Sequence, residues 1–270
     1  MSKPIDLTAP FDENYFRHGC GEPYARSAAW LNLHNAYAEH IAREIQPASV
    51  LDAGCAIGLL VEALRARTIE AWGIDISPYA IGQVAESTKP YCRVQSITEP
   101  FGQRYGLIVC IEVLEHLPKA ESEKALANLC AHTDDVLFSS SPEDYAEATH
   151  FNVQPPEYWA EQFAQRGFYR DVDFDASFIT PWAARFCKQG APVHRLARNY
   201  ERKYWQLQRE NAQLRKQAND ARSTREVLAH KAQLIEERNG ALAEMDRLLT
   251  LVKAYEQGRF MRFMRWLKRR

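Results

Sequence analysis

The chain has 270 residues, 46% of them hydrophobic and 26% charged, which is typical of a globular protein with one full core, and this length allows one or two domains. Its six cysteines are scattered without a C-x-x-C pair, so we expect neither a zinc site nor a disulfide framework, and a reducing cytoplasm is favoured. The sequence opens on no targeting pattern and contains no apolar run long enough to span a bilayer, so we expect a cytoplasmic protein.

The two ends of the chain differ in charge. Residues 191–270 hold 19 Lys and Arg against 9 Asp and Glu, whereas residues 1–190 hold the other 15 basic and 26 acidic residues. An acidic domain with a basic extension is typical of a protein whose extension meets an anionic partner.

A lead-in and a helix precede the first predicted strand. The lead-in, residues 11–27, carries Tyr24 and Arg26 near its end. Apolar residues then recur at a partly helical period up to Pro47, which predicts a helix over residues 28–45.

The stretch SVLDAGCAIG, residues 49–58, has the pattern of a strand, a tight loop and the start of a helix. Its apolar opening predicts a strand over residues 49–53, and the segment LLVEALRAR predicts a helix over residues 59–67. Gly54 and Gly58 allow the loop between them to take positive φ angles and to lie against a ligand.

A second strand, expected over residues 70–75, ends in Asp75. An acid at this position holds a ribose diol in doubly wound nucleotide-binding folds. Alternating strands and helices follow, so we predict a Rossmann-like, doubly wound α/β fold with a mostly parallel, seven-stranded sheet. The further strands are expected at 91–95, 106–111, 134–140, 168–175 and 177–180, and the helices at 78–86, 120–131 and 157–166.

Three segments follow one another at βαβ spacing: VLDAGCAIG, GIDIS and YGLIVCIEVLEHLP. Together they resemble the class I S-adenosylmethionine-dependent methyltransferases, whose pattern is a (V/L)LDxGCGxG loop, an acid after the second strand and an EVLEHL-type exit from the fourth. An NAD-binding Rossmann domain fits less well, because the loop reads GCAIG and not GxGxxG. The resemblance implies a methyltransferase domain over residues 1–190 with S-adenosyl-L-methionine as its cofactor.

The resemblance also implies which residues contact the cofactor. Tyr24 and Arg26, in the lead-in, would hold the methionine carboxylate by a charge-assisted bond, unless they belong to an ordinary surface segment. The other expected contacts stand at the carboxyl ends of the first four strands: Asp52, Gly54, Cys55, Gly58, Asp75, Ile76, Ser96, Ile97, Ile111 and Glu112.

Three positions depart from the family pattern. Ala56 replaces the middle glycine of the loop, Ser96 stands where an acid usually contacts the adenine amino group, and Gly106 replaces an acid before the fourth strand. A serine hydroxyl can still form a hydrogen bond, and alanine is the smallest replacement for glycine, so cofactor binding is still expected.

Transfer of a methyl group to an alcohol needs a base within hydrogen-bond reach of the hydroxyl. The catalytic candidates are His116, in EVLEHLP, and His150, in the loop after the fifth strand. A structural role is the alternative for each, and Glu112 and Glu115 are the second choice. We see no clustered carboxylates that would indicate magnesium and expect no metal.

The last third of the chain changes character. From residue 200 to about 254 it contains one glycine and no proline, and apolar residues recur every seventh position, which predicts a coiled coil over residues 195–256. Asn211 and Asn239 at the partner position favour a parallel homodimer, and a solvated single helix is the alternative. The apolar stripe consists of Leu207, Leu214, Ala221, Leu228, Ile235, Leu242 and Leu249.

The closing segment, residues 257–270, ends in GRFMRFMRWLKRR. On a helix its Phe and Met side chains share one face and its arginines the other, which predicts a basic amphipathic helix on an anionic membrane surface. A protein partner is the second choice for this segment. Nucleic acid is the last, because the preceding domain is acidic.

The whole layout resembles methyltransferases of bacterial surface polysaccharides, including O-antigen-type enzymes with a C-terminal coiled coil. This implies O-methylation of a sugar hydroxyl on a cell-surface glycan or a lipid-linked sugar acceptor, on the inner face of the plasma membrane, with a glycosyltransferase as a further partner. The alternatives are a small-molecule or quinone O-methyltransferase, and an inactive methyltransferase-fold scaffold that acts through its coiled coil.

Overall fold

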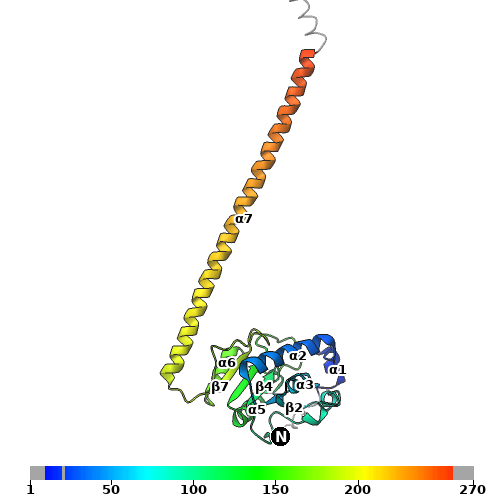
Figure 1. Ribbon diagram of the computed structural model, residues 1–270, viewed down its shortest axis with the longest axis vertical. Helices are drawn as coiled ribbons and strands as arrows, with labels where there is room; N and C mark the ends of the chain where they lie inside the picture. The colour runs from blue at the N-terminus through cyan, green and yellow to red at the C-terminus, as the bar shows by residue number, and fades with distance from the viewer. Residues whose placement is uncertain (1–9, 20–21, 258–270) are drawn as a thin grey trace, which may run out of the picture. The chain divides into compact units, whose positions relative to one another are not determined.

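A computed structural model describes residues 10–19 and 22–257, and Figure 1 shows their path. Seven strands form one sheet in the order β3-β2-β1-β4-β5-β7-β6, which confirms the predicted sheet. The strands β1 to β5 pair in parallel, whereas β7 runs antiparallel to both β5 and β6. The strands are β1 (Ser49–Ala53), β2 (Glu70–Asp75), β3 (Cys92–Val94), β4 (Leu107–Ile111), β5 (Asp135–Ser139), β6 (Phe168–Arg170) and β7 (Ala184–Lys188).

Short polar residues set the starts of several helices. Asp12, Ser27 and Ser77 each stand just before a helix and accept a hydrogen bond from a backbone N–H of its first turn. The helices and helical turns of the described chain are α1 (Glu13–His18), α2 (Ala28–His40), η1 (Ile41–Ile45), α3 (Leu59–Arg65), α4 (Pro78–Gly82), η2 (Lys89–Tyr91), η3 (Leu114–His116), α5 (Lys119–His132), α6 (Pro156–Ala164) and α7 (Val193–Gln257).

Two apolar layers enclose the sheet. On one face α2, η1 and α3 pack against strand side chains such as Val50 and Val109, and on the other α5 and α6 pack against Leu51 and Ile108. Neighbouring residues of one strand therefore serve opposite layers, as the two-residue period of a strand requires. The strand order reverses between β1 and β4, so the crevice at their carboxyl ends is the place where this architecture binds ligands.

The final strand of the sheet differs from its prediction. We expected strands over 168–175 and 177–180, but β6 ends at Arg170 and β7 begins only at Ala184. The residues between them form turns and bends whose apolar side chains, among them Ile179, pack with α2, and the Phe178 ring stacks on His40 at a centroid distance of 4.3 Å. The apolar residues of this stretch are therefore buried against the helices and do not form a strand.

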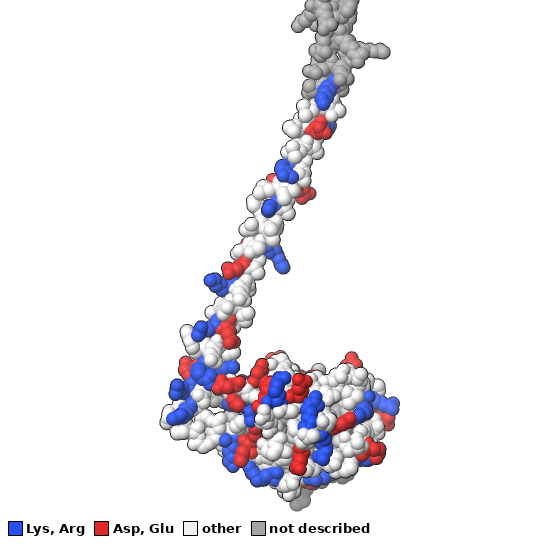
Figure 2. Space-filling view, in the orientation of Figure 1, with Lys and Arg blue, Asp and Glu red and all other residues white. Residues whose placement is uncertain are grey.

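Contacts divide the chain into one unit up to Tyr200 and another from Glu201 onward. The second unit contains most of α7, a helix of 65 residues along which basic and acidic side chains are interspersed (Figure 2). The described apolar side chains of its stripe are exposed to solvent. The long helix is thus present over the predicted range, and its pairing into a coiled coil stays a prediction.

The basic amphipathic helix predicted at the end of the chain lies almost entirely in residues 258–270, outside the described residues. Among the helices that are described, none combines the length and apolar character needed to cross a membrane.

Candidate functional site

The loop between β1 and α3 is held in a conformation that needs glycine. Gly54 has φ +96° and Gly58 has φ +74°. A Cβ atom at Gly54 would lie 2.3 Å from the Cγ2 atom of Val113, so the loop can approach the segment after β4 only because this residue has no side chain. The Gly54 and Cys55 N–H groups both donate to the carbonyl oxygen of Ile74, which ties the loop to β2.

Asp75 is fixed at the tip of β2 by the same loop. Its Oδ2 atom accepts the N–H of Ala56 at 2.8 Å, and its Oδ1 atom accepts the N–H of Ser77 at 2.8 Å. Burial raises the pKa of Asp75, and these backbone donors oppose that effect. The predicted glycine loop and the predicted acid are therefore directly bonded, with Ala56 at φ +47° making the link.

Asp52 lies at the end of β1 beneath this loop with only 6% of its surface exposed. Burial, and secondarily the charge of Asp75, raise the pKa of Asp52 to about 7. Two acids so close together at a ligand-binding edge favour a cationic ligand, because a positive charge offsets both the desolvation and the mutual repulsion.

The other expected cofactor contacts stand at the same sheet edge and differ in how far they are buried. Ile76 and Ile111 are half-buried, whereas Ile97 is buried. The Ser96 hydroxyl lies 2.8 Å from the hydroxyl of Thr98. The Cys55 side chain packs in the core against the sulfur of Cys92, and this contact and burial raise the pKa of its thiol well above the usual value. Cys55 therefore offers its backbone, not its side chain, to a ligand.

Tyr24 and Arg26 are engaged within the protein. The Tyr24 hydroxyl lies 3.0 Å from Nε2 of His34, whose Nδ1 faces the carbonyl oxygen of Trp30 and therefore carries the proton. Tyr24 is thus the donor of the first bond. Arg26 forms a two-armed ion pair with Glu62 on α3, the helix that the glycine loop leads into.

The carboxyl end of β4 carries a strained acid. Glu112 has φ +52°, a left-handed conformation that non-glycine residues adopt mainly where tertiary contacts impose it. Its Oε1 atom accepts hydrogen bonds from the Ser139 hydroxyl at 2.6 Å and from Nε1 of Trp182 at 3.0 Å. Trp182, which the sequence analysis did not single out, thus connects the β4 edge to the loop before β7.

Glu115, three residues further on, is completely buried. Its Oε1 atom accepts the N–H of Ser141, and its Oε2 atom has no hydrogen-bond donor among the described residues. Burial, with the charge of Glu112, raises the pKa of Glu115 well above the usual range. Its backbone carbonyl accepts the N–H groups of Phe151 and Asn152, which fixes the loop after β5 against η3.

This loop brings the two predicted catalytic histidines together. The rings of His116 and His150 have centroids 4.6 Å apart. Both side chains are largely enclosed, with 11% and 5% of their surface exposed respectively. Burial, and next the charge of His150, lower the pKa of His116 to about 4, so its imidazole is neutral at physiological pH.

The hydrogen bonds of the pair fix its tautomers. Nδ1 of His150 lies 2.8 Å from the carbonyl oxygen of Asp144, which can only accept. Nδ1 of His116 lies 3.0 Å from the hydroxyl of Thr149, which donates its own proton to Glu147 and so accepts from the imidazole. Both Nδ1 atoms therefore carry a proton. Nε2 of His116 presents a lone pair, whereas Nε2 of His150 lies 3.2 Å from Oε2 of Glu147 and faces that carboxylate.

The residues around this pair were not predicted. Asp144, Glu147 and Thr149 belong to an irregular loop, where no period or motif marks a residue. The local signal was only the loop's place after the fifth strand, which pointed to His150 itself.

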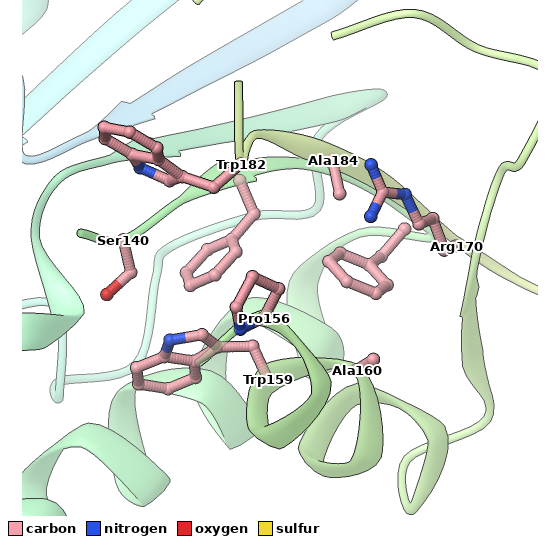
Figure 3. A pocket seen from close by; sticks show the side chains of 9 residues that line it. Ser140, Pro156, Trp159, Ala160, Arg170, Trp182 and Ala184 are labelled. Atoms are coloured by element: carbon pink, nitrogen blue, oxygen red, sulfur yellow. The ribbon is translucent and has the colours of Figure 1, made fainter. Parts of the chain in front are cut away.

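Two hollows lie near this edge. Figure 3 shows the first, with Trp182 on one side, Trp159 and Pro156 on the opposite side and Ser140 nearby. Nε1 of Trp159 and the Ser140 hydroxyl are buried there without a hydrogen-bond partner among the described residues. The second is an open groove of about 420 Å³, lined by Ser141, Pro142, Glu143, Asp144 and Trp182. Trp182 lines both, and Asp144 connects the groove to His150.

A family model described as a methyltransferase domain matches residues 25–171, just over half of the chain. Curated relatives include the ubiquinone biosynthesis O-methyltransferase of Methylococcus capsulatus, 29% identical over 143 residues that make up 48% of this chain and 56% of the relative. The protein of the same name from Aromatoleum aromaticum is 31% identical over 52% of this chain and 62% of its own length. The chain spans about half the length of the curated relatives it matches.

A solved structure with a similar fold is the magnesium protoporphyrin IX methyltransferase of Synechocystis PCC 6803 with bound SAH. It has a TM-score of 0.50 and 16% sequence identity, and the match covers 67% of this chain and 96% of that one. At this identity the likeness concerns the fold.

Proposed function

This chain belongs to the class I S-adenosylmethionine-dependent methyltransferases, and from that premise we propose that it transfers the methyl group to a hydroxyl oxygen of an aromatic ring, as in a quinone precursor. The observation that carries the proposal is the pair His116 and His150. The two imidazoles lie 4.6 Å apart at the ligand-binding edge, Nε2 of His116 presents a lone pair, and Nε2 of His150 faces the Glu147 carboxylate at 3.2 Å. An alcohol or phenol must lose a proton during transfer, and such a pair supplies the base.

The surroundings support an aromatic acceptor. The groove beside His150 is walled by the indole of Trp182, and the adjoining hollow by Trp159 and two phenylalanines (Figure 3). Flat apolar walls with a few polar groups suit a ring that carries hydroxyls. The curated relatives named above bear the name ubiquinone biosynthesis O-methyltransferase, which agrees with an acceptor of this class.

The proposed reaction is an in-line displacement. The acceptor's O–H bond breaks and its proton passes to the histidine pair, while the oxygen forms a bond to the methyl carbon. The carbon–sulfur bond breaks with its electron pair staying on sulfur, which leaves S-adenosylhomocysteine. The chain's task is to align oxygen, carbon and sulfur and to exclude water.

Labelled S-adenosylmethionine tests the proposal, with a prenylated dihydroxybenzoate and a lipid-linked glycan as parallel acceptors. We expect label in the phenolic acceptor, and a loss of at least 100-fold in kcat/KM for His150→Ala. His230→Ala, on the exposed part of α7, is the matched control and should leave turnover unchanged. Label in neither acceptor while the cofactor still binds would contradict the proposal and favour a scaffold.

One observation favours a sugar hydroxyl as the second candidate acceptor. The methyltransferase family match ends at residue 171, so the whole of α7 lies outside it. A long helix with a basic end would serve an enzyme that works on a glycan assembled at a membrane, together with a glycosyltransferase. Label in the glycan arm of the same experiment, and none in the phenol, would select this candidate.

We also propose that α7 pairs with a second copy of this chain as a parallel coiled coil. The stripe residues are exposed in the single chain, for example Leu214 at 64% and Leu228 at 60%. The repeat of seven and the asparagines Asn211 and Asn239 are self-complementary in a parallel pair, because each asparagine then faces its own copy. Sedimentation equilibrium of the full chain should give the mass of a dimer, and a monomer at micromolar concentration would contradict it.

A further inference from the structure

The hollow drawn in Figure 3 contains two polar groups whose hydrogen-bonding capacity is unused. It lies between α6 and the ends of β5 and β7, and its apolar wall includes Phe138, Ala184 and Phe186. Trp159 and Ser140 are each only 3% exposed, and neither Nε1 of the indole nor the hydroxyl has a partner among the described residues. Buried polar groups without a partner are costly, so two of them in one hollow indicate a ligand group that the chain itself does not supply.

Bonds on both sides of Ser140 set the direction of its side chain. The hydroxyl of the preceding residue, Ser139, donates to Glu112 after β4, and the N–H of Ser141 donates to Glu115. Because successive side chains of an extended chain point to opposite sides, Ser140 points away from Glu112. Its hydroxyl is therefore held toward α6, where it lines the hollow.

Trp159 is held as firmly as Ser140. Its ring contacts Phe138 edge to face at a centroid distance of 5.3 Å and Tyr158 at 5.1 Å. An indole N–H can only donate a hydrogen bond, and a serine hydroxyl can donate as well. The ligand group that satisfies both must therefore be an acceptor, such as the oxygens of a carboxylate.

The charges around the hollow favour an anionic oxygen over a neutral one. Among the described residues that line it, Arg170 is the only charged one, and its half-buried guanidinium also donates to the Ala183 carbonyl. Pro156, which also lines the hollow, is the first residue of α6, and no side chain caps that helix. The positive end of the helix dipole therefore lies at the hollow.

Figure 3 separates these contributions. The Ser140 oxygen and the Trp159 nitrogen lie at one end of the hollow in this view, and Arg170 lies at the other. The two donors therefore provide the direct bonds, and the guanidinium contributes through its charge.

The size of the hollow limits what enters it. Its volume is about 20 Å³, which suits a group about as large as a water molecule and excludes an aromatic ring. Through Trp182 it adjoins the open groove of about 420 Å³ that Asp144 connects to His150. A ring that lies in the groove can therefore place one small substituent in the hollow.

We propose that the hollow binds a carboxylate of the acceptor through the Trp159 N–H and the Ser140 hydroxyl. This proposal rests on the proposed O-methylation and narrows its acceptor from a phenol to a phenolic acid. The carboxylate anchors the ring, and the hydroxyl to be methylated lies toward the histidine pair. Trp159 and Ser140 are then specificity-determining residues, because an acceptor without the carboxylate leaves both donors unpaired.

Matched acceptors test the site by turnover. We compare 2,3- and 3,4-dihydroxybenzoate with 3- and 4-methylcatechol, in which a methyl group replaces the carboxylate. The KM of the better acid should be at least about tenfold lower than that of its methyl counterpart, because hydrogen bonds to a charged group are strong. Trp159→Phe and Ser140→Ala should each raise the KM of the acid at least about fivefold and so bring the two KM values together.

Ser122→Ala is the matched control for these variants. Ser122 is also a buried serine whose hydroxyl has no partner among the described residues, but it belongs to α5 and does not line the hollow. This variant should keep the ratio of the two KM values. A loss of the preference in Ser122→Ala as well would trace it to general loosening of the core and would overturn the proposal.

A second measurement does not depend on turnover. In the full chain with ¹⁵N-labelled tryptophan and bound S-adenosylhomocysteine, the indole signal that disappears in Trp159→Phe belongs to Trp159. Dihydroxybenzoate should move this signal downfield, as a new hydrogen bond to an anion requires, whereas methylcatechol and acetate at equal concentration should move it much less. The other indole signals show that each variant is folded.

The outcomes separate this proposal from the proposed function. Equal KM values for the acids and the methylcatechols, unchanged by either variant, mean that the hollow holds only water; the proposal is then overturned and the O-methylation stands. If acetate moves the Trp159 signal as far as dihydroxybenzoate does, the hollow binds a free carboxylate and its assignment to the acceptor is wrong. If dihydroxybenzoate moves the signal but no phenol is methylated, the carboxylate site stands and the proposed function is overturned.

Discussion

The N-terminal unit and α7 place their apolar side chains in opposite ways. In the N-terminal unit the central residues of β1, β4 and β5 are completely buried between two helical layers. Along α7 the large residues of the stripe are 43–64% exposed. The first unit buries its apolar residues in its own core. The apolar stripe of the second unit is not buried by any part of this chain. The site chemistry lies entirely in the first, so α7 is expected to act by pairing and placement.

The sharpest test of this contrast makes one substitution in both units. Gly54→Ala puts a Cβ 2.3 Å from Val113 on a backbone of φ +96°, and should cost about 2–4 kcal/mol of unfolding free energy and at least 100-fold in cofactor affinity. Gly240→Ala meets nothing within 4 Å in a helix interior, and should stabilise α7 by about 1 kcal/mol. Calorimetric titration and urea unfolding measure both changes.

The pair of variants fails as a contrast if Gly54→Ala binds the cofactor normally. That outcome would mean that the loop moves away from Val113 at little cost, and the close approach seen in the fold would not define the cofactor site.

The second test breaks the stripe of α7. Leu228→Asp combined with Ile235→Asp puts two charges on a surface that we expect to be buried between copies, and should shift the dimer to monomer by at least 100-fold in Kd. Turnover of a soluble acceptor should stay within twofold, because the site lies in the other unit. Sedimentation equilibrium and a turnover assay measure the two effects.

Val227 and Leu234 provide the matched control for this test. They are 67% and 50% exposed and stand one position before the stripe. Val227→Asp with Leu234→Asp should leave the dimer nearly intact. If both double variants dissociate equally, the register of the coiled coil is wrong.

The third test uses the titration of a buried acid. Asp52 has a pKa of about 7 in the folded chain, against about 3.9 when unfolded, so the folded state holds more protons between these values. Its contribution to stability is therefore full below pH 4 and is lost as the pH rises to 7, on the order of 4 kcal/mol in all. Asp52→Asn removes this loss, so the variant should gain stability relative to the parent as pH rises from 4 to 7.

Urea unfolding at several pH values between 4.5 and 7.5 measures this change. Asp220→Asn, on the exposed surface of α7, is the control and should show no such trend. If the unfolding free energy of Asp52→Asn and of the parent chain changed with pH in the same way, the pKa of the Asp52 carboxyl would not be raised in the folded chain, and the prediction would be wrong.

Strands β1 and β2 begin and end where the sequence predicts, because each is a short apolar run with turn residues on both sides. The glycine loop and Asp75 were also predictable, because a backbone conformation that requires glycine restricts the residues that the sequence can have there. Strand β7 was not, because the apolar residues before it look like a strand but pack on α2. Hydrophobic alternation says that a residue is buried and not which element buries it.

The histidine site divides in the same way. His116 stands in a motif and could be named as a candidate. Glu147 and Thr149 acquire their roles only because the Glu115 carbonyl binds the backbone of the loop and fixes its path. Contacts between two irregular segments depend on tertiary structure, and no period in the sequence encodes them.

The test with the smallest expected effect concerns the loop between β1 and α3. The same change, alanine to glycine, should alter stability in opposite directions in the two units. Ala56 has φ +47°, where alanine is strained and glycine is not, and its N–H still reaches Asp75 in either case. Ala56→Gly relieves this strain but frees the unfolded chain, so unfolding free energy should rise by less than about 1 kcal/mol and cofactor affinity should change less than threefold. Ala241→Gly, in the helix of α7, should lower stability by about 1 kcal/mol. A loss of stability in Ala56→Gly as large as in Ala241→Gly would mean that the left-handed turn costs alanine nothing, and the departure from the family's glycine would need another cause.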